Sequence, residues 1–144
     1  MKTLFAFILA LMCSTTLFAQ PSEFAQSVDM SPLSDNVAVF TDGRVKSFET
    51  FARSYMPYIM GSKSFKGQDV SFTYFDMMIL PERYYGQDII YVKHKGLRSA
   101  IIGEVDITDP QMKERMDRFM KTGLVSREVL QSQTVSKLLN SLRK

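Results

Sequence analysis

Valine alternates with other apolar residues in a short stretch near residue 40, before the spacing of apolar positions becomes helical. Residues 37–40 read Val-Ala-Val-Phe, an alternation of side chains with the period of a β-strand. Asp42 and Gly43 follow, and this pair favours a tight reversal because glycine accepts positive φ and aspartate tolerates it. Residues 44–46 return as a second short strand. The pattern therefore predicts a β-hairpin.

The predicted hairpin leads directly into a helix. Ser47 can cap this helix, because a serine hydroxyl accepts a hydrogen bond from a backbone N–H two or three residues further on. Apolar and aromatic residues then follow at helical spacing: Phe48, Phe51, Ala52 and Tyr55. We expect Pro57 to kink or end the helix, since proline removes a donor and clashes with the preceding turn. Gly61 is a natural stop.

A second helix is predicted from Ser71 to Leu80, and Pro81 ends it. This helix is rich in Phe, Met and Ile and is nearly apolar on all sides, which is typical of a buried helix. Residues 89–92 form a short β-branched run that predicts a strand. We expect this strand to add to the hairpin.

Three further helices are predicted in the remainder of the chain. The first covers residues 96–102 and stops at a glycine. The second covers residues 110–121, with proline at its favoured first position and Thr108 or Asp109 as its cap. The third covers residues 127–142, with Ser126 as its cap, and carries a stripe of Leu and Val at helical spacing.

Residues 1–19 are typical of a secretory signal peptide. Lys2 supplies the charged start, residues 4–12 supply the apolar core, and a cut before Gln20 would release the mature chain. An uncleaved N-terminal anchor and a lipoprotein modified at Cys13 are the alternatives. Removal of the signal leaves no cysteine, and therefore no disulfide and no thiol-ligated metal.

These elements predict a mainly α protein with a small β-hairpin or sheet, of the α+β class, built as one small domain after the signal peptide. Residues 20–35 are polar and contain two prolines, and we expect them to form a flexible leader. Residues 36–103 are the expected hairpin–helix core domain. Residues 104–144 form a C-terminal helical pair, which either packs on the core or awaits a partner.

The segment 43–53, which reads Gly-Arg-Val-Lys-Ser-Phe-Glu-Thr-Phe-Ala-Arg, resembles a motif of bacterial cytochrome c biogenesis proteins. The motif opens a soluble extracytoplasmic region of the haem-lyase type, the membrane proteins of the second biogenesis system. Ser47 stands where that family usually has proline. Residues 71–92 and the Leu-Arg-Ser-Ala-Ile-Ile-Gly of residues 97–103 also look similar. The resemblance spans residues 36–103, about half of the chain.

The resemblance implies a periplasmic or otherwise extracytoplasmic protein whose partner is a membrane-bound cytochrome c biogenesis protein. The haem-handling membrane part of that family carries a tryptophan-rich segment and several spanning helices, whereas this sequence contains no tryptophan. It also lacks the Cys-x-x-Cys-His motif of haem attachment. We therefore expect a non-enzymatic accessory or scaffold without a resident cofactor. A generic periplasmic protein-interaction module with no role in haem handling is the alternative.

Five residues are the candidate binding residues: Arg44, Lys46, Arg53, Tyr84 and Tyr85. A planar guanidinium makes bidentate contacts with carboxylates, and a haem propionate is one such group. Paired tyrosines offer a flat aromatic contact surface. The alternatives are an internal ion pair of Arg53 with Glu49, four residues earlier on the helix, and a packing role for the tyrosines.

The net charge and the small number of side chains suited to catalysis limit the functions that this sequence favours. The formal net charge is +3, and residues 111–144 carry eight Lys and Arg against three Asp and Glu. This basic end is either a solvated helical face or a peripheral contact with an anionic membrane surface or an acidic partner. The excess of positive charge is too small to favour binding of nucleic acid.

A small hydrolase would depend on His94, the only histidine, and no nucleophile elbow surrounds any serine. No catalytic residue and no metal site is predicted.

Overall fold

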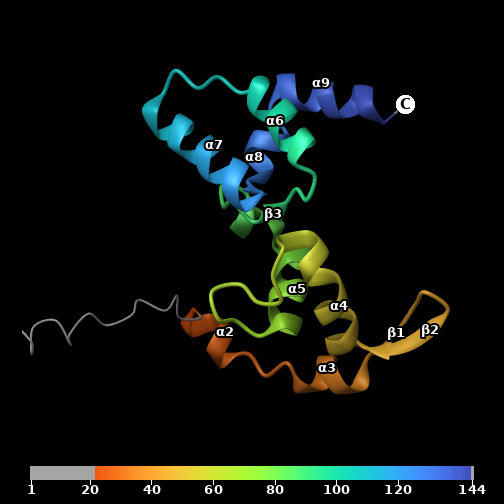
Figure 1. The fold of residues 1–144 in the computed structure, drawn as a ribbon. Coiled ribbons are helices and arrows are strands. Elements are labelled where there is room, and N and C mark those ends of the chain that lie inside the picture. Colours follow the sequence, from red (N-terminus) through yellow and green to blue (C-terminus); the bar gives the residue numbers. More distant parts are fainter. Residues whose placement is uncertain (1–21, 144) are drawn as a thin grey trace, which may run out of the picture.

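A computed structural model describes residues 22–143. Helices dominate, and two separate two-stranded antiparallel sheets complete the fold, so the predicted mainly α, α+β class is confirmed (Figure 1). The predicted signal peptide, residues 1–19, lies outside the described residues. Within residues 22–143, none of the helices combines the length and the apolar character that a membrane span requires.

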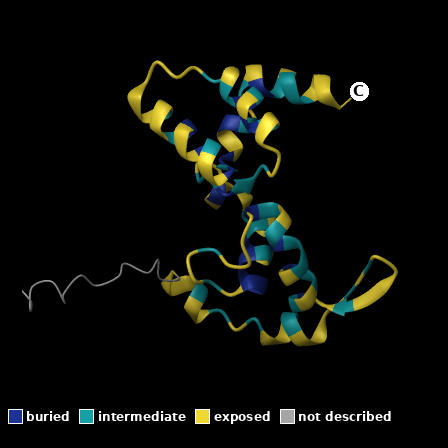
Figure 2. Ribbon diagram, in the orientation of Figure 1, coloured by how far each residue is buried: buried dark blue, intermediate teal, exposed yellow. Residues whose placement is uncertain are grey.

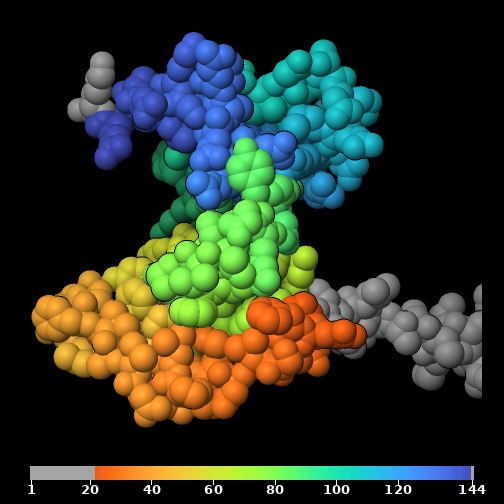
Figure 3. All heavy atoms as spheres, turned by 180° about the vertical axis from the view of Figure 1, so that it is seen from behind, coloured from red at the N-terminus to blue at the C-terminus, as the bar shows by residue number. Residues whose placement is uncertain are grey.

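The described elements follow one another in two lobes that meet near Ile90. The N-terminal lobe contains α2 (Glu23–Ser27), α3 (Ser31–Asn36), β1 (Ala38–Thr41), β2 (Arg44–Ser47), α4 (Phe48–Met60), α5 (Val70–Ile79) and the 3₁₀ helix η1 (Pro81–Tyr84). After β3 (Ile90–Tyr91), the C-terminal lobe contains α6 (Lys95–Gly103), α7 (Pro110–Thr122), β4 (Leu124–Val125), α8 (Arg127–Leu130) and α9 (Gln133–Leu142). The space-filling view shows a narrower neck between the lobes (Figure 3).

Each lobe has its own buried cluster of side chains. The N-terminal cluster contains Ala52, Met56, Met60, Val70, Tyr84 and Ile89. The C-terminal cluster contains Ile101, Met116, Phe119, Val125, Val129 and Val135. Ile90 packs against both clusters and therefore joins the two cores. Buried positions follow the inner faces of the helices in each lobe (Figure 2).

The hairpin and the helix after it form as the sequence predicts. Ala38 pairs with Ser47 and Thr41 pairs with Arg44, and the turn between the strands has positive φ at Asp42 (51°) and Gly43 (71°). Two successive positive φ values give the turn geometry that suits the twist of a hairpin. The Ser47 hydroxyl accepts from the Thr50 N–H at 3.3 Å and so caps α4.

Helix α4 continues through Pro57 and ends at Gly61, which has φ 70°. We expected Pro57 either to kink or to end the helix, and the second of these expectations is wrong. The buried face of α4, formed by Phe48, Ala52, Met56 and Met60, runs along its whole length. Burial of that face on both sides of the proline favours continuation, because apolar packing offsets the lost backbone hydrogen bond.

Residues 20–35, expected to be flexible, contain helical structure within their described part. Ser22 caps α2 by accepting from the Ala25 N–H at 3.2 Å. Phe24 packs edge-on against Phe72 of α5, with ring centroids 5.9 Å apart. A helix this short depends on tertiary contacts rather than on propensity. The polar composition of the segment therefore did not predict helix α2, which the contact between Phe24 and Phe72 stabilises.

Helix α5 is not buried on all sides as the apolar run predicted. Its inner face carries Ser71, Thr73 and Asp76 beside Val70 and Phe72, while Met78 and Ile79 are 57% and 56% exposed. The helix packs chiefly on α4 and η1, so only one side is covered. Because polar and apolar residues occur on both faces, hydrophobic periodicity could not identify the buried side.

The predicted strand at residues 89–92 is shorter than expected and pairs elsewhere. Ile90 pairs with Val125 and Tyr91 pairs with Leu124, so β3 joins β4 rather than the hairpin. Helix α6, which we expected within the 36–103 unit, packs in the C-terminal lobe, where Ile101 is fully buried. The division between the two cores therefore lies near residue 90.

The C-terminal helices begin and end close to the predicted residues, but the last predicted helix is divided into two. Asp109 caps α7 by accepting from the Gln111 N–H at 3.1 Å, and Gly123 ends that helix with φ 81°. Ser126 caps α8 as predicted. The expected helix 127–142 is interrupted between Leu130 and Gln133.

Candidate functional site

The hairpin presents an apolar outer face that no other element of residues 22–143 covers. Phe40 of β1 lies opposite Val45 of β2, and the two side chains are 74% and 68% exposed. The opposite face of the hairpin turns toward α4, where the Thr41 hydroxyl and the Tyr55 hydroxyl are 2.9 Å apart. The hairpin projects from the N-terminal lobe as an arm (Figure 1). We call Phe40 and Val45 the hairpin's outer face.

The three predicted basic residues lie at or near this arm but differ in their partners. Lys46 pairs with Asp42 across the turn at 3.4 Å. Arg53 pairs with Glu49 on α4, which is the internal ion pair that we gave as the alternative. Arg44 is exposed at the end of β2, and within residues 22–143 it has no ion pair. Among the three, Arg44 is therefore the cation most available to a partner.

The two predicted tyrosines face different environments. Tyr84 is 7% exposed and belongs to the N-terminal core, whereas Tyr85 is 44% exposed. They do not form one flat surface. Tyr84 instead lines a cleft whose other lining residues include Phe24 of α2. Helix α2 and the hairpin arm lie on opposite sides of the N-terminal lobe (Figure 1). Of the five predicted residues, three therefore lie at or near the hairpin, Tyr84 lines the cleft, and Tyr85 belongs to neither place.

The cleft has a volume of about 460 Å³, within the usual range for small-molecule sites. Helix α2, the loop before α5, α5 itself and η1 form its walls. Its lining residues are aromatic, cationic and amide-bearing, with one carboxylate: Ser22, Phe24, Phe65, Lys66, Gln68, Phe72, Asp76, Arg83, Tyr84 and Gln87. We call this the α2 cleft.

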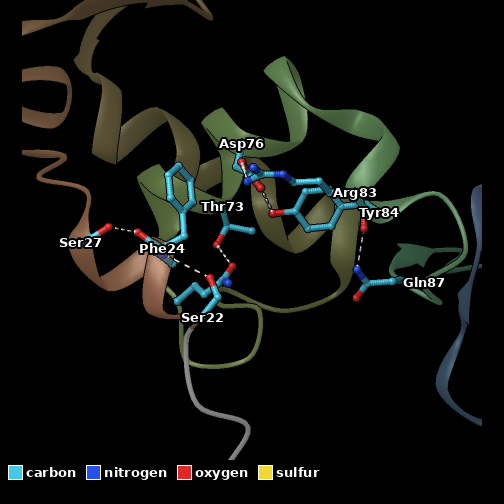
Figure 4. A network of polar contacts seen from close by, with 10 residues as sticks. Ser22, Phe24, Ser27, Thr73, Asp76, Arg83, Tyr84 and Gln87 are labelled. Atoms are coloured by element: carbon cyan, nitrogen blue, oxygen red, sulfur yellow. Dashed lines mark hydrogen bonds and ion pairs between the residues drawn. The ribbon is translucent and has the colours of Figure 1, made fainter.

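Asp76 is the centre of the polar network in the α2 cleft (Figure 4). The Tyr84 hydroxyl donates to Asp76 Oδ2 at 2.7 Å, and Arg83 Nη1 donates to Asp76 Oδ1 at 2.9 Å. Burial raises the pKa of Tyr84 well above its ordinary value, and the hydrogen bond to Asp76 adds to the effect. Because both carboxylate oxygens have a donor, Asp76 is compensated within the fold.

The sequence signal that could have identified this network is a lone carboxylate inside an apolar helix. Asp76 interrupts the Phe- and Met-rich run of α5, and such a buried acid needs a paired cation or donor. Arg83 and Tyr84 lie two and three residues after Pro81, the proline that follows the helix. Nothing in the sequence indicated that Lys66 lines the cleft, because its position depends on the conformation of the loop between α4 and α5.

The basic C-terminal region is partly compensated by internal ion pairs. Arg115 Nη2 lies 2.8 Å from Asp88 Oδ1, and Arg118 pairs with Glu114 at 3.7 Å. His94, the only histidine, caps α6: its Nδ1 accepts from the Leu97 N–H at 3.2 Å. The part of the chain that the structure describes contains no group of three or more His, Cys, Asp or Glu side chains suited to a metal.

Comparisons of this chain with protein-family models, with curated proteins and with solved structures found no match.

Proposed function

We propose that this protein is an exported, non-enzymatic binding module that docks on a partner through the hairpin's outer face. The proposed partner is a membrane-bound cytochrome c biogenesis protein, and the proposed role is that of an accessory or scaffold in cytochrome c maturation. The signal-like N-terminus and the family-like segment 43–53 support export and this choice of partner. The residues of that segment include the whole of β2 and its exposed Arg44.

The observation that carries the proposal is the exposure of Phe40 and Val45 as a cross-strand pair. An aromatic residue and an aliphatic residue with more than two thirds of their surface in solvent would gain about 1.5–3 kcal/mol each on full burial. Aromatic residues are enriched at the centres of protein interfaces. Arg44 precedes Val45 in β2 but pairs with Thr41, so it belongs to the other face of the hairpin, next to the turn. Hydrophobic docking is therefore the binding mode that the outer face of the hairpin favours.

The hairpin does not depend on its outer face for its own structure. The turn at Asp42 and Gly43 sets the register, and the hydrogen bond between Thr41 and Tyr55 fixes the inner face against α4. Substitutions at Phe40 and Val45 should consequently leave the fold intact. This separation makes the proposed interface testable without loss of the protein.

The non-enzymatic part of the proposal is supported by the internal hydrogen bonds of two titratable groups, Asp76 and His94. Asp76 accepts two hydrogen bonds inside the fold, and His94 serves as a helix cap. A general base must be within hydrogen-bond reach of a substrate proton. In both residues the acceptor atoms already have donors from the chain itself.

Gene deletion in a cell that makes c-type cytochromes tests the maturation role. We expect haem-stained c-type cytochromes to fall in the deletion strain and to recover with the wild-type gene. The Phe40→Ser, Val45→Thr double variant, expressed at the same level, should not restore them. Unchanged cytochrome levels after deletion would refute the maturation role and leave the generic interaction module as the remaining proposal.

A further inference from the structure

We propose that the α2 cleft binds a small aromatic carboxylate. The cleft is lined by four aromatic rings and carries one cation that has no carboxylate partner among residues 22–143. Helix α2, which forms one wall, and the hairpin lie on opposite sides of the N-terminal lobe (Figure 1). The proposal is therefore independent of the docking surface and of the maturation role. It rests on three features of the cleft: its aromatic walls, the charge of Lys66 and the backbone that holds Lys66.

The aromatic rings of the cleft come in two pairs from different elements. Phe24 of α2 and Phe72 of α5 have ring centroids 5.9 Å apart, and Phe65 and Tyr84 have centroids 5.7 Å apart. Both pairs are tilted rather than parallel, at 64° and 59°. Four rings around a volume of about 460 Å³ favour a flat, conjugated ligand, because aromatic groups gain from edge and offset contacts beyond simple burial.

The charge of the cleft favours an anion. Arg83 is paired with Asp76, so these two lining charges compensate each other. Lys66 Nζ lies 5.0 Å from the centroid of Phe65 and donates to Gln87 Oε1 at 3.2 Å. No Asp or Glu within residues 22–143 forms an ion pair with Lys66. One uncompensated ammonium beside aromatic rings matches a ligand with one carboxylate.

The backbone at Lys66 is held in a conformation that L-residues seldom adopt. Lys66 has φ 49° and Gly67 has φ 71°, so the turn carries a lysine where asparagine or glycine would cost less. Strain at a residue that lines a cavity is typical of functional positions. Here the strained turn places the ammonium next to Phe65 and Gln87 at the mouth of the cleft.

Helix α2 completes the proposed site from the N-terminal side. The Arg83 guanidinium carbon lies 5.0 Å from the centroid of Phe24, and Phe24 remains 51% exposed. Figure 4 shows Phe24 reaching from α2 toward the side of the cleft that Asp76 and Arg83 occupy. A bound ring would cover part of the exposed surface of Phe24, so α2 supplies binding surface as well as a wall.

Titration calorimetry of the full chain with 2-naphthoate, together with amide shift mapping by NMR, tests the proposal. We expect saturable binding, with shifts confined to residues 22–24, 65–68, 72–76 and 83–87. The neutral isostere 2-naphthamide should bind about tenfold more weakly, because it loses the charge-assisted contact with Lys66. No binding, or equal affinity for the two compounds, would overturn the proposal.

Variants in one loop separate the role of the charge from that of the fold. Lys66→Gly removes the ammonium and suits the positive φ, so the melting temperature should hold or rise while 2-naphthoate affinity falls about tenfold. Lys63→Gln removes an exposed lysine three residues earlier and should leave affinity unchanged. Unchanged affinity in Lys66→Gly, or shifts that map to the hairpin, would show that the cleft is not the site.

Discussion

Arg98 Nη1 donates to the carbonyl oxygen of Met120 at 3.0 Å, which fixes α6 to the last turn of α7. The same guanidinium donates to the carbonyl oxygens of Val92 at 2.6 Å and Lys93 at 3.3 Å. Arg98 is only 5% exposed, and all of these partners are backbone carbonyls. The charge is favoured there because the carboxyl end of a helix carries partial negative charge. Arg98 therefore organises the C-terminal lobe without a carboxylate partner.

Replacing Arg98 with lysine should destabilise the protein by about 1–3 kcal/mol, because a single ammonium cannot reproduce the planar fork and leaves buried carbonyls unsatisfied. Urea denaturation of Arg98→Lys against the wild type measures this difference. The matched control is Arg53→Lys, an exposed residue of α4 whose partner is Glu49, and it should change little. Equal stability of Arg98→Lys and the wild type would contradict the role of the three carbonyl contacts.

Gly123→Ala should cost about 3 kcal/mol, the sum of an unfavourable φ and a steric conflict. A Cβ at Gly123 would lie 2.4 Å from Arg98 Nη2 and 2.9 Å from Tyr91 Cε2. The guanidinium cannot move away without breaking its hydrogen bonds. Gly43→Ala has a similar φ and nothing within 4 Å, so it should cost only about 1 kcal/mol. Thermal or urea unfolding of both variants isolates the steric part, and equal costs would refute it.

Tyr84 should make stability fall at alkaline pH. Its pKa is raised in the folded state, so the contribution is complete below about pH 10 and is lost as the unfolded chain releases its proton above that pH. Tyr84→Phe should lower stability at pH 7 by about 1–2 kcal/mol, since Asp76 loses a donor, and should show a smaller alkaline decline. Tyr58→Phe, at an 81% exposed position, is the control that keeps the wild-type decline.

The ion pair between Arg115 and Asp88 should contribute more than the pair between Arg118 and Glu114. Arg115 and Asp88 side chains are 19% and 29% exposed and connect α7 to the segment before β3, whereas Arg118 and Glu114 are 63% and 74% exposed. Double-mutant cycles should give a coupling of about 1–2 kcal/mol for the first pair and near zero for the second. Equal coupling energies would argue against a structural role for Arg115.

Local signals allowed much of the secondary structure to be predicted. The turn at Asp42 and Gly43 and the caps at Ser47, Asp109 and Ser126 each depend on neighbouring residues, and each is confirmed. These features need no knowledge of the rest of the chain. They are the features that propensity and capping rules describe well.

Features that depend on distant contacts could not be predicted in the same way. The pairing of Tyr91 with Leu124 involves two-residue strands more than thirty positions apart, too short to carry a periodic pattern. Helix α2 depends on the contact of Phe24 with Phe72. Most of the α2 cleft was missed for the same reason, because Lys66 and Asp76 line one cleft only as a result of tertiary packing.

Affinity capture of the tagged, exported protein from gently solubilised membranes, with partners identified by mass spectrometry, tests the proposed function most directly. We predict recovery of a multi-spanning, tryptophan-rich haem lyase with the wild type, and its loss with the Phe40→Ser, Val45→Thr double variant of unchanged stability. Met78→Ser, on the exposed side of α5, is the control that should retain the partner. Equal recovery with the hairpin double variant, or no haem lyase with the wild type, would contradict the proposal.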